Sequence, residues 1–179
     1  MTFKTDVNYR RQSLIKLLNC IQSQEQEIIK ALYDDFKKPA FEAVATETNY
    51  IISELNHTIK NIHKWAKPTL VLPSFLNFPS IDYIYKEPYG KVLIIAPWNY
   101  PYHLALCPVI AAVAAGNQVV VKPSELTPNT SKIIAKIIKE TFEIEHVHCV
   151  EGNADVAQKL LEQRWDYIFF TGKIGRAHV

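Results

Sequence analysis

A regular alternation of apolar and helix-like segments between Gly90 and Gly172 constrains the fold most strongly. Four segments rich in apolar residues, 92–96, 118–122, 146–150 and 167–170, predict strands, and helical patterns separate them. Strands that alternate with helices in this way form right-handed βαβ units and a parallel sheet. We therefore expect an α/β fold that contains the first part of a doubly wound parallel sheet, with 92–96 covered on both faces.

Local signals predict where the helices of this region begin and end. Gly116 is a natural stop for the helix over 102–115. The pair Thr127-Pro128 is a typical helix start, with the threonine as cap. Asn153 is expected to cap a short helix that runs through Leu161.

Residues 1–66 are expected to form an amino-terminal helical segment, because apolar residues recur there at helical spacing. Ser23 and Gln26 have the spacing of a capping box, which predicts that a second helix starts there. Pro39 suits the first turn of a further helix, which should end before Pro68. The residues on the predicted apolar faces are Leu14, Leu17, Leu18, Ile21, Ile28, Ile29, Leu32, Phe36, Val44, Ile51, Ile52, Leu55, Ile59 and Ile62.

The segment 67–89 is expected to connect the helical segment to the sheet. Prolines interrupt 67–80, which we interpret as an ordered surface connection. Residues of alternating character over 81–86 then predict one half-buried strand.

Composition excludes several classes of protein. The 179 residues are 48% hydrophobic and 21% charged, as in ordinary globular proteins. The 20 basic and 18 acidic residues are interspersed, so no nucleic-acid partner is expected. Neither a signal peptide nor a membrane-spanning stretch is evident. Three widely spaced cysteines fit a reducing compartment, so we expect a cytoplasmic protein without a membrane partner.

Ligands of a doubly wound sheet bind beyond the carboxyl ends of its strands. Three segments fall there: 97–101 after the first strand, 122–125 after the second and 171–172 after the fourth. The first of these turns lacks the glycine-rich dinucleotide fingerprint. A turn that carries two prolines and one asparagine stands in its place.

The chain contains Glu87-Pro88-Tyr89-Gly90 and Ala96-Pro97-Trp98-Asn99-Tyr100-Pro101, then Ala114-Ala115-Gly116-Asn117 and Val121-Lys122-Pro123-Ser124-Glu125, and finally Phe169-Phe170-Thr171-Gly172. In order and spacing these motifs strongly resemble the aldehyde dehydrogenase superfamily. The Trp-Asn-Tyr-Pro turn and the short lead-in resemble its class 3 branch, which acts on fatty and aromatic aldehydes. The resemblance implies a partial Rossmann-like domain over 90–172, NAD or NADP as cofactor, an aldehyde substrate and, for the full-length protein, a homodimer.

The resemblance assigns Asn99 to the oxyanion hole. A thiolate that adds to an aldehyde leaves an alkoxide, and a fixed N–H donor stabilises that charge as it develops. The alternative is an asparagine that only closes a turn ahead of Pro101. In the same turn, Pro97 and Trp98 are expected to contact the cofactor.

The same resemblance assigns Lys122 and Glu125 to the adenine-side ribose of the cofactor. The Glu125 carboxylate should repel a 2′-phosphate and so favour NAD mildly. The alternatives are a solvated strand end for Lys122 and, for Glu125, a carboxylate that favours the next helix's amino end. Thr171 and Gly172 match the start of the turn that approaches the pyrophosphate.

After Gly172 the chain departs from the family pattern, and we interpret 173–179 as a foreign or frameshifted tail. None of Cys20, Cys107 and Cys149 matches the family's nucleophile, and apolar burial would raise the pKa of each thiol. The family's catalytic cysteine and glutamate are therefore missing from the chain, which alone should be inactive.

The histidines of the chain are not expected to bind a metal ion. His146 and His148 are two residues apart, but no third metal ligand is evident, so we expect surface imidazoles and no metal site. We assign no role to His103.

Two other functions remain open beside an aldehyde dehydrogenase. One is an acyl-CoA or acyl-phosphate reductase of the same superfamily, which the Pro-Trp-Asn-Tyr-Pro turn argues against. The other is a non-catalytic nucleotide-binding or interaction fragment.

Overall fold

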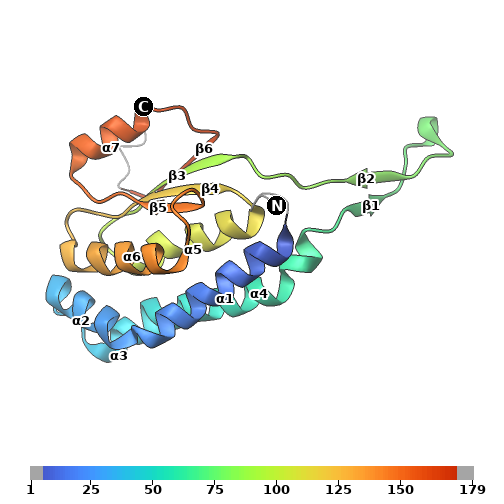
Figure 1. The fold of residues 1–179 in the computed structure, drawn as a ribbon. Coiled ribbons are helices and arrows are strands. Elements are labelled where there is room, and N and C mark those ends of the chain that lie inside the picture. The colour runs from blue at the N-terminus through green and yellow to red at the C-terminus, as the bar shows by residue number, and fades with distance from the viewer. Residues whose placement is uncertain (1–5, 173–179) are drawn as a thin grey trace.

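The computed structural model describes residues 6–172, and the predicted parallel sheet is confirmed (Figure 1). Its strands are β3 (Lys91–Ile95), β4 (Gln118–Lys122), β5 (Val147–Cys149) and β6 (Tyr167–Phe170), in the spatial order β5-β4-β3-β6. All three neighbouring pairs are parallel. Residues 173–179, which we interpreted as a tail, lie outside the described residues.

Helices cover both faces of this sheet. Helices α5 (Pro101–Ala115) and α6 (Pro128–Thr141) lie on one face, and α7 (Ala154–Leu161) lies on the other (Figure 1). The chain steps from β3 through β4 to β5 in one direction and then returns to place β6 beside β3. Right-handed crossovers therefore put α7 on the opposite face. The reversal makes the boundary between β3 and β6 the topological switch point of the sheet.

The amino-terminal helices form a further layer beneath α5 and α6 (Figure 1). They are α1 (Val7–Ser23), α2 (Glu25–Phe36) and α4 (Asn49–Trp65). Their predicted apolar faces are buried at Leu14, Leu17, Ile21, Ile28, Leu32, Ile51, Leu55 and Ile62. Each such side chain contributes roughly 1.5–3 kcal/mol of hydrophobic free energy. None of the helices in residues 6–172 combines the length and apolarity needed to cross a membrane.

The predicted capping box at Ser23 and Gln26 is wrong. The second helix has Gln24 as its N-cap, and no side chain caps it. The Ser23 hydroxyl instead donates to the carbonyl oxygen of Cys20 at 2.9 Å. A serine at a helix end can bond back to the preceding turn in this way, and it is then not available to cap the next helix.

The next helix also departs from the prediction. Pro39 is the N-cap of α3 (Ala40–Ala43) rather than a residue of its first turn. A π-helical turn, η1 (Val44–Thr48), then separates α3 from α4. Such turns interrupt the regular helical repeat and occur frequently at functional sites. The helix ends at Trp65, before Pro68, as predicted.

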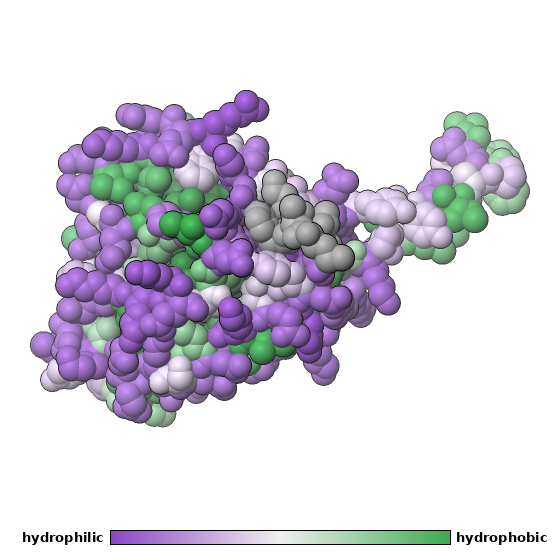
Figure 2. All heavy atoms as spheres, viewed as in Figure 1, coloured by the Kyte–Doolittle hydropathy of each residue, from purple (hydrophilic) through white to green (hydrophobic). Residues whose placement is uncertain are grey.

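The segment 67–89 contains a two-stranded antiparallel ribbon that projects from the body (Figure 1). Strand β1 (Thr69–Val71), which the sequence did not predict, pairs with β2 (Asp82–Ile84), and a 3-10 turn, η2 (Phe75–Asn77), lies between them. The predicted strand within 81–86 is confirmed as β2, but its half-buried character is wrong, because Tyr83 and Ile84, on opposite faces, are both more than half exposed. Figure 2 shows apolar side chains at the tip of this ribbon.

Two of the predicted helix-end signals are confirmed. Gly116 follows α5 with a φ of 93°, a left-handed conformation that glycine adopts without strain. The Asn153 side chain accepts hydrogen bonds from the N–H groups of Asp155 and Val156 at the start of α7. Both signals act within one helical turn of the residue concerned.

The predicted start of α6 at Thr127-Pro128 is confirmed, but the expected cap by the threonine side chain is wrong. Thr127 stands at the N-cap position, but its hydroxyl donates to the carbonyl oxygen of Ser124 at 3.2 Å. The Asp35 carboxylate, from the end of α2, accepts from the N–H groups of Asn129 at 3.1 Å and Thr130 at 2.7 Å. A carboxylate distant in sequence therefore satisfies donors that helix starts leave without intrahelical partners.

Candidate functional site

The three segments predicted to bind ligands emerge side by side from the sheet. Ile95, the last residue of β3, pairs with Lys122 on one side and Phe170 on the other. Beyond the strands, Ala96 N donates to the Lys122 carbonyl at 3.0 Å, and Thr171 N donates to the Ile95 carbonyl at 3.1 Å. The structure therefore brings the segments 97–101, 122–125 and 171–172 to one edge, at the topological switch point.

The turn that carries Asn99 presents its central residues to solvent. Trp98, Asn99 and Tyr100 are exposed, and Pro97 is half-buried. The Trp98 ring stacks on the ring of Phe36 at a centroid distance of 6.5 Å. Within residues 6–172, the Asn99 amide makes no hydrogen bond, which leaves it open to a ligand.

A buried carboxylate that the sequence analysis missed anchors the helix after this turn. Glu47 is fully buried, and its Oε2 accepts from the N–H groups of Tyr102 at 2.9 Å and His103 at 3.2 Å. Its Oε1 accepts from Lys38 Nζ at 2.5 Å. The only signal in the sequence is a charged residue within a mainly apolar helical face, and no local rule gives its partner.

Lys122 is not a solvated strand end. The residue is 2% exposed, and its Nζ lies 2.5 Å from Glu125 Oε2. The Glu125 side chain is 39% exposed, so the pair has one buried cation and one carboxylate at the surface. A buried ammonium requires such a partner.

Hydroxyl groups of α6 and its N-cap hold the loop that carries Lys122 and Glu125. The Ser124 carbonyl oxygen accepts from the Ser131 hydroxyl at 2.7 Å, in addition to the Thr127 hydroxyl. The Ser124 hydroxyl oxygen in turn accepts from Leu126 N at 3.3 Å. The loop is therefore tied to the helix that Asp35 caps, which fixes where Glu125 stands.

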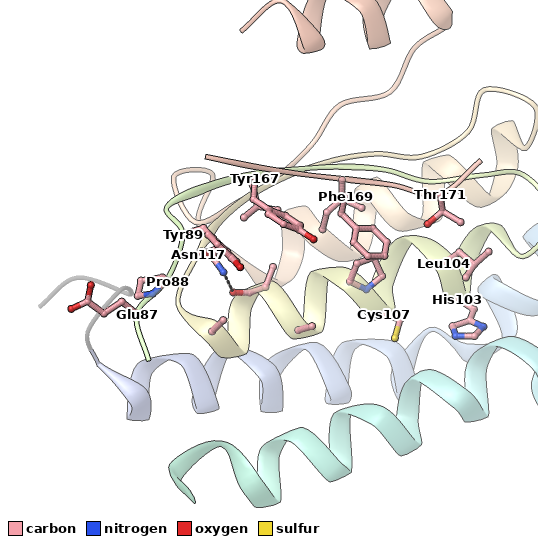
Figure 3. Close-up of a pocket in the computed structure, with 16 residues that line it drawn as sticks. Glu87, Pro88, Tyr89, His103, Leu104, Cys107, Asn117, Tyr167, Phe169 and Thr171 are labelled. Atoms are coloured by element: carbon pink, nitrogen blue, oxygen red, sulfur yellow. Dashed lines mark hydrogen bonds between the residues drawn. The ribbon is translucent and has the colours of Figure 1, made fainter. Parts of the chain in front are cut away.

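A groove of about 450 Å³ lies between α5 and β6 (Figure 3). Tyr167 and Phe169 from β6 face Leu104 and Cys107 from α5 across it. His103 and Thr171 line the end next to the carboxyl edge of the sheet. Burial lowers the pKa of His103, although the nearby Glu47 acts in the opposite direction, so its imidazole is neutral at pH 7. No motif in the sequence indicated this groove.

The cysteines are poor nucleophiles, as predicted. Burial raises the pKa of Cys149 to about 12, with a further contribution from Glu151. Burial also raises the pKa of Cys20 and of Cys107. At neutral pH all three thiols therefore remain protonated.

The prediction of two surface histidines is wrong for His146. His148 is exposed, but His146 is 1% exposed and lies 5.6 Å from the rings of both Tyr9 and Phe142. His146 precedes β5, and its ring lies against Tyr9 of α1 and Phe142 at the end of α6. No group of three or more potential metal ligands occurs in residues 6–172.

Known proteins share this fold and sequence. A family model described as "Aldehyde dehydrogenase family" matches residues 2–177. The chain is 43% identical over 167 residues to the 4,4'-diaponeurosporen-aldehyde dehydrogenase of Staphylococcus aureus, covering 93% of this chain and 36% of the relative. It is 40% identical over 170 residues to aldehyde dehydrogenase family 3 member H1 of Arabidopsis thaliana, covering 94% of this chain and 35% of that protein.

A solved structure supports the same assignment. The substrate-bound state of Staphylococcus aureus AldH superposes with a TM-score of 0.93 at 43% identity, over 96% of this chain and 37% of that one. The chain thus spans little more than a third of the length of these relatives. The match of nearly the whole sequence to the family model shows that this chain belongs to the aldehyde dehydrogenase family.

Proposed function

We propose that the chain supplies the amino-terminal, cofactor-binding part of a class 3 aldehyde dehydrogenase, which oxidises a fatty or aromatic aldehyde to the acid. The main support is the convergence of 97–101, 122–125 and 171–172 at the switch point. Because the chain spans 36% of a curated relative and its three thiols are protonated, the nucleophile and the base for water must come from the rest of the protein.

In this proposal Asn99 stabilises the charge that develops on the aldehyde oxygen. When a cysteine thiolate adds to the carbonyl carbon, a C–S bond forms and the carbonyl π electrons move to oxygen. The Asn99 amide donates a hydrogen bond to that oxygen and lowers the barrier. NAD or NADP, when bound, would supply the acceptor for the hydride that must leave the same carbon.

Lys122 and Glu125 would hold the adenine-side ribose. The surface-exposed Glu125 carboxylate offers acceptor oxygens to ribose hydroxyls, and the buried Lys122 fixes its position. Pro97 and Trp98 would form one wall of the site. The backbone at Thr171 and Gly172 would approach the pyrophosphate.

The oxyanion role can be tested by Asn99→Ala in the full-length protein that carries this sequence. We expect turnover of a medium-chain or aromatic aldehyde to fall by about 10²–10³, the usual loss for one oxyanion donor, with cofactor affinity retained. Absorbance of the reduced cofactor gives turnover, and fluorescence titration gives affinity. A loss of less than about threefold would mean that Asn99 only closes the turn.

The cofactor assignment predicts a change in selectivity on Glu125→Gln. Removing the carboxylate removes its repulsion of a 2′-phosphate, so the kcat/KM ratio of NADP to NAD should rise about tenfold. Glu145→Gln, which removes an exposed carboxylate before β5, at the opposite edge of the sheet, is the matched control and should leave the ratio unchanged. If both variants behave alike, Glu125 does not face the ribose.

The projecting ribbon supports a homodimer of the full-length protein as part of this proposal. Its exposed apolar side chains include Leu72, Phe75 and Leu76, each more than 90% exposed. Apolar surface of this kind marks an interaction site.

The three free cysteines are consistent with our expectation of a cytoplasmic location.

A further inference from the structure

Glu47 is buried where its carboxylate meets the start of α5. The helix has Tyr100 as N-cap and no side-chain cap of its own, so the N–H groups of Tyr102 and His103 lack intrahelical partners. Glu47 accepts from both, at 2.9 and 3.2 Å. A carboxylate is also favoured at the positive end of a helix. This contact joins two elements more than 50 residues apart in the sequence.

Lys38 neutralises this carboxylate away from water. Its side chain is 7% exposed, and its Nζ lies 2.5 Å from Glu47 Oε1. Buried ion pairs are often no more stabilising than apolar residues of similar volume, so stability alone is a weak reason for this pair. Glu47 also lies in the π-helical turn η1, which changes the direction of side chains relative to a regular helix. Both features favour a role in positioning the backbone at the start of α5.

The same region of the chain contacts both neighbours of Asn99. Phe36 stacks on Trp98, the residue before Asn99, and Lys38 Nζ lies 4.8 Å above the ring of Tyr100, the residue after it. Together with the Glu47 hydrogen bonds, these contacts hold the turn on either side of Asn99. The Asn99 amide itself makes none of them.

We propose that Glu47, with Lys38 as its counterion, is a positioning residue for the Asn99 amide. It acts through the backbone of Tyr102 and His103 and touches no reacting atom. This inference rests on the proposed oxyanion role of Asn99. An oxyanion donor must stand within hydrogen-bond distance of the developing charge, and a displacement of about 1 Å can cost on the order of 10² in rate.

The test compares two variants of the full-length protein, Lys38→Met/Glu47→Leu and Lys38→Met/Glu47→Gln. Both remove the buried charges, and only glutamine keeps an oxygen that can accept from Tyr102 and His103. We expect kcat of the leucine variant to be about tenfold below that of the glutamine variant, with equal KM for NAD. Titration with NAD gives the fraction of folded enzyme, to which kcat is normalised. Equal kcat values would overturn the proposal.

Both variants are then combined with Asn99→Ala. If Glu47 acts through Asn99, the tenfold ratio should fall to about one, because the donor it positions is gone. A ratio that stays near ten would assign Glu47 to general structure and overturn this inference while the proposed function stands. If Asn99→Ala by itself does not lower turnover, the oxyanion role fails first, and the inference fails with it.

Hydrogen exchange tests the contact without any variant. The amides of Tyr102 and His103 lie at the second and third positions of α5, where exchange is ordinarily fast. In the unmodified full-length protein we expect both to exchange at least about tenfold more slowly than in an unstructured peptide. Exchange at the unstructured rate would overturn the proposal even if the leucine variant does not fold.

Discussion

The two edges of the sheet differ sharply in how they are covered. At the β5 edge, Val147 is 2% exposed, and α6 packs against this strand. At the β6 edge, all four residues are apolar or aromatic, yet each is 39–44% exposed. The apolar patterns of both segments, β5 and β6, predicted strands. The difference teaches that apolar character predicts a strand, whereas the neighbouring elements decide whether it is buried.

The largest expected effect comes from two phenylalanines at opposite edges. Phe142, at the end of α6, is 8% exposed and packs against His146, whereas Phe169 in β6 is 39% exposed. In this chain, Phe142→Ala should lower the free energy of unfolding by about 3 kcal/mol, and Phe169→Ala by less than about 1 kcal/mol. Urea denaturation measures both. Equal losses would show that the β6 edge is covered as well as the β5 edge.

The β5 edge should also respond to pH through His146. Burial, together with the nearby positive charge of Arg10, lowers the pKa of this imidazole from 6.5 to about 4. The unfolded chain therefore binds a proton more readily than the native one, and this stability is present above the unfolded pKa and lost as pH falls toward 4. Between about pH 7 and 5, roughly 1–2 kcal/mol of the free energy of unfolding should disappear.

His146→Phe, whose ring suits the same aromatic surroundings, should remove most of that pH dependence. His148→Phe is the control, because this exposed imidazole stays hydrated in both states. Urea denaturation at several pH values gives, for each protein, the slope of the free energy of unfolding against pH. A slope that His146→Phe leaves unchanged would mean that other groups cause the acid sensitivity.

The smallest expected effect concerns the cap of α6, the helix beside β5. Asp35→Ala removes the acceptor for the N–H groups of Asn129 and Thr130 and should cost about 1 kcal/mol. Asp34→Ala is the matched control, since Asp34 makes a surface pair with Lys30, and its loss should cost about 0.3 kcal/mol. Thermal denaturation distinguishes the two. A similar loss in both variants would make the cap unimportant for this edge.

The sequence predicted most of the candidate site because its parts follow strands directly. Segments 97–101, 122–125 and 171–172 were expected beyond the carboxyl ends of strands, and they lie there. It did not predict that Glu47 and Asp35 cap the helices after two of these strands. Their partners are more than 50 residues away, beyond the reach of any capping rule.

By itself, the sequence determined the strands and helices of the second half, the glycine after α5 and the Asn153 cap. Their causes are local, since hydrophobic period, backbone freedom and caps act within about one turn. Only the tertiary structure decided that β6 lies beside β3, that Lys122 is buried and that the ribbon is exposed on both faces. Burial and long-range hydrogen bonds depend on which surfaces meet, and no single segment carries that information.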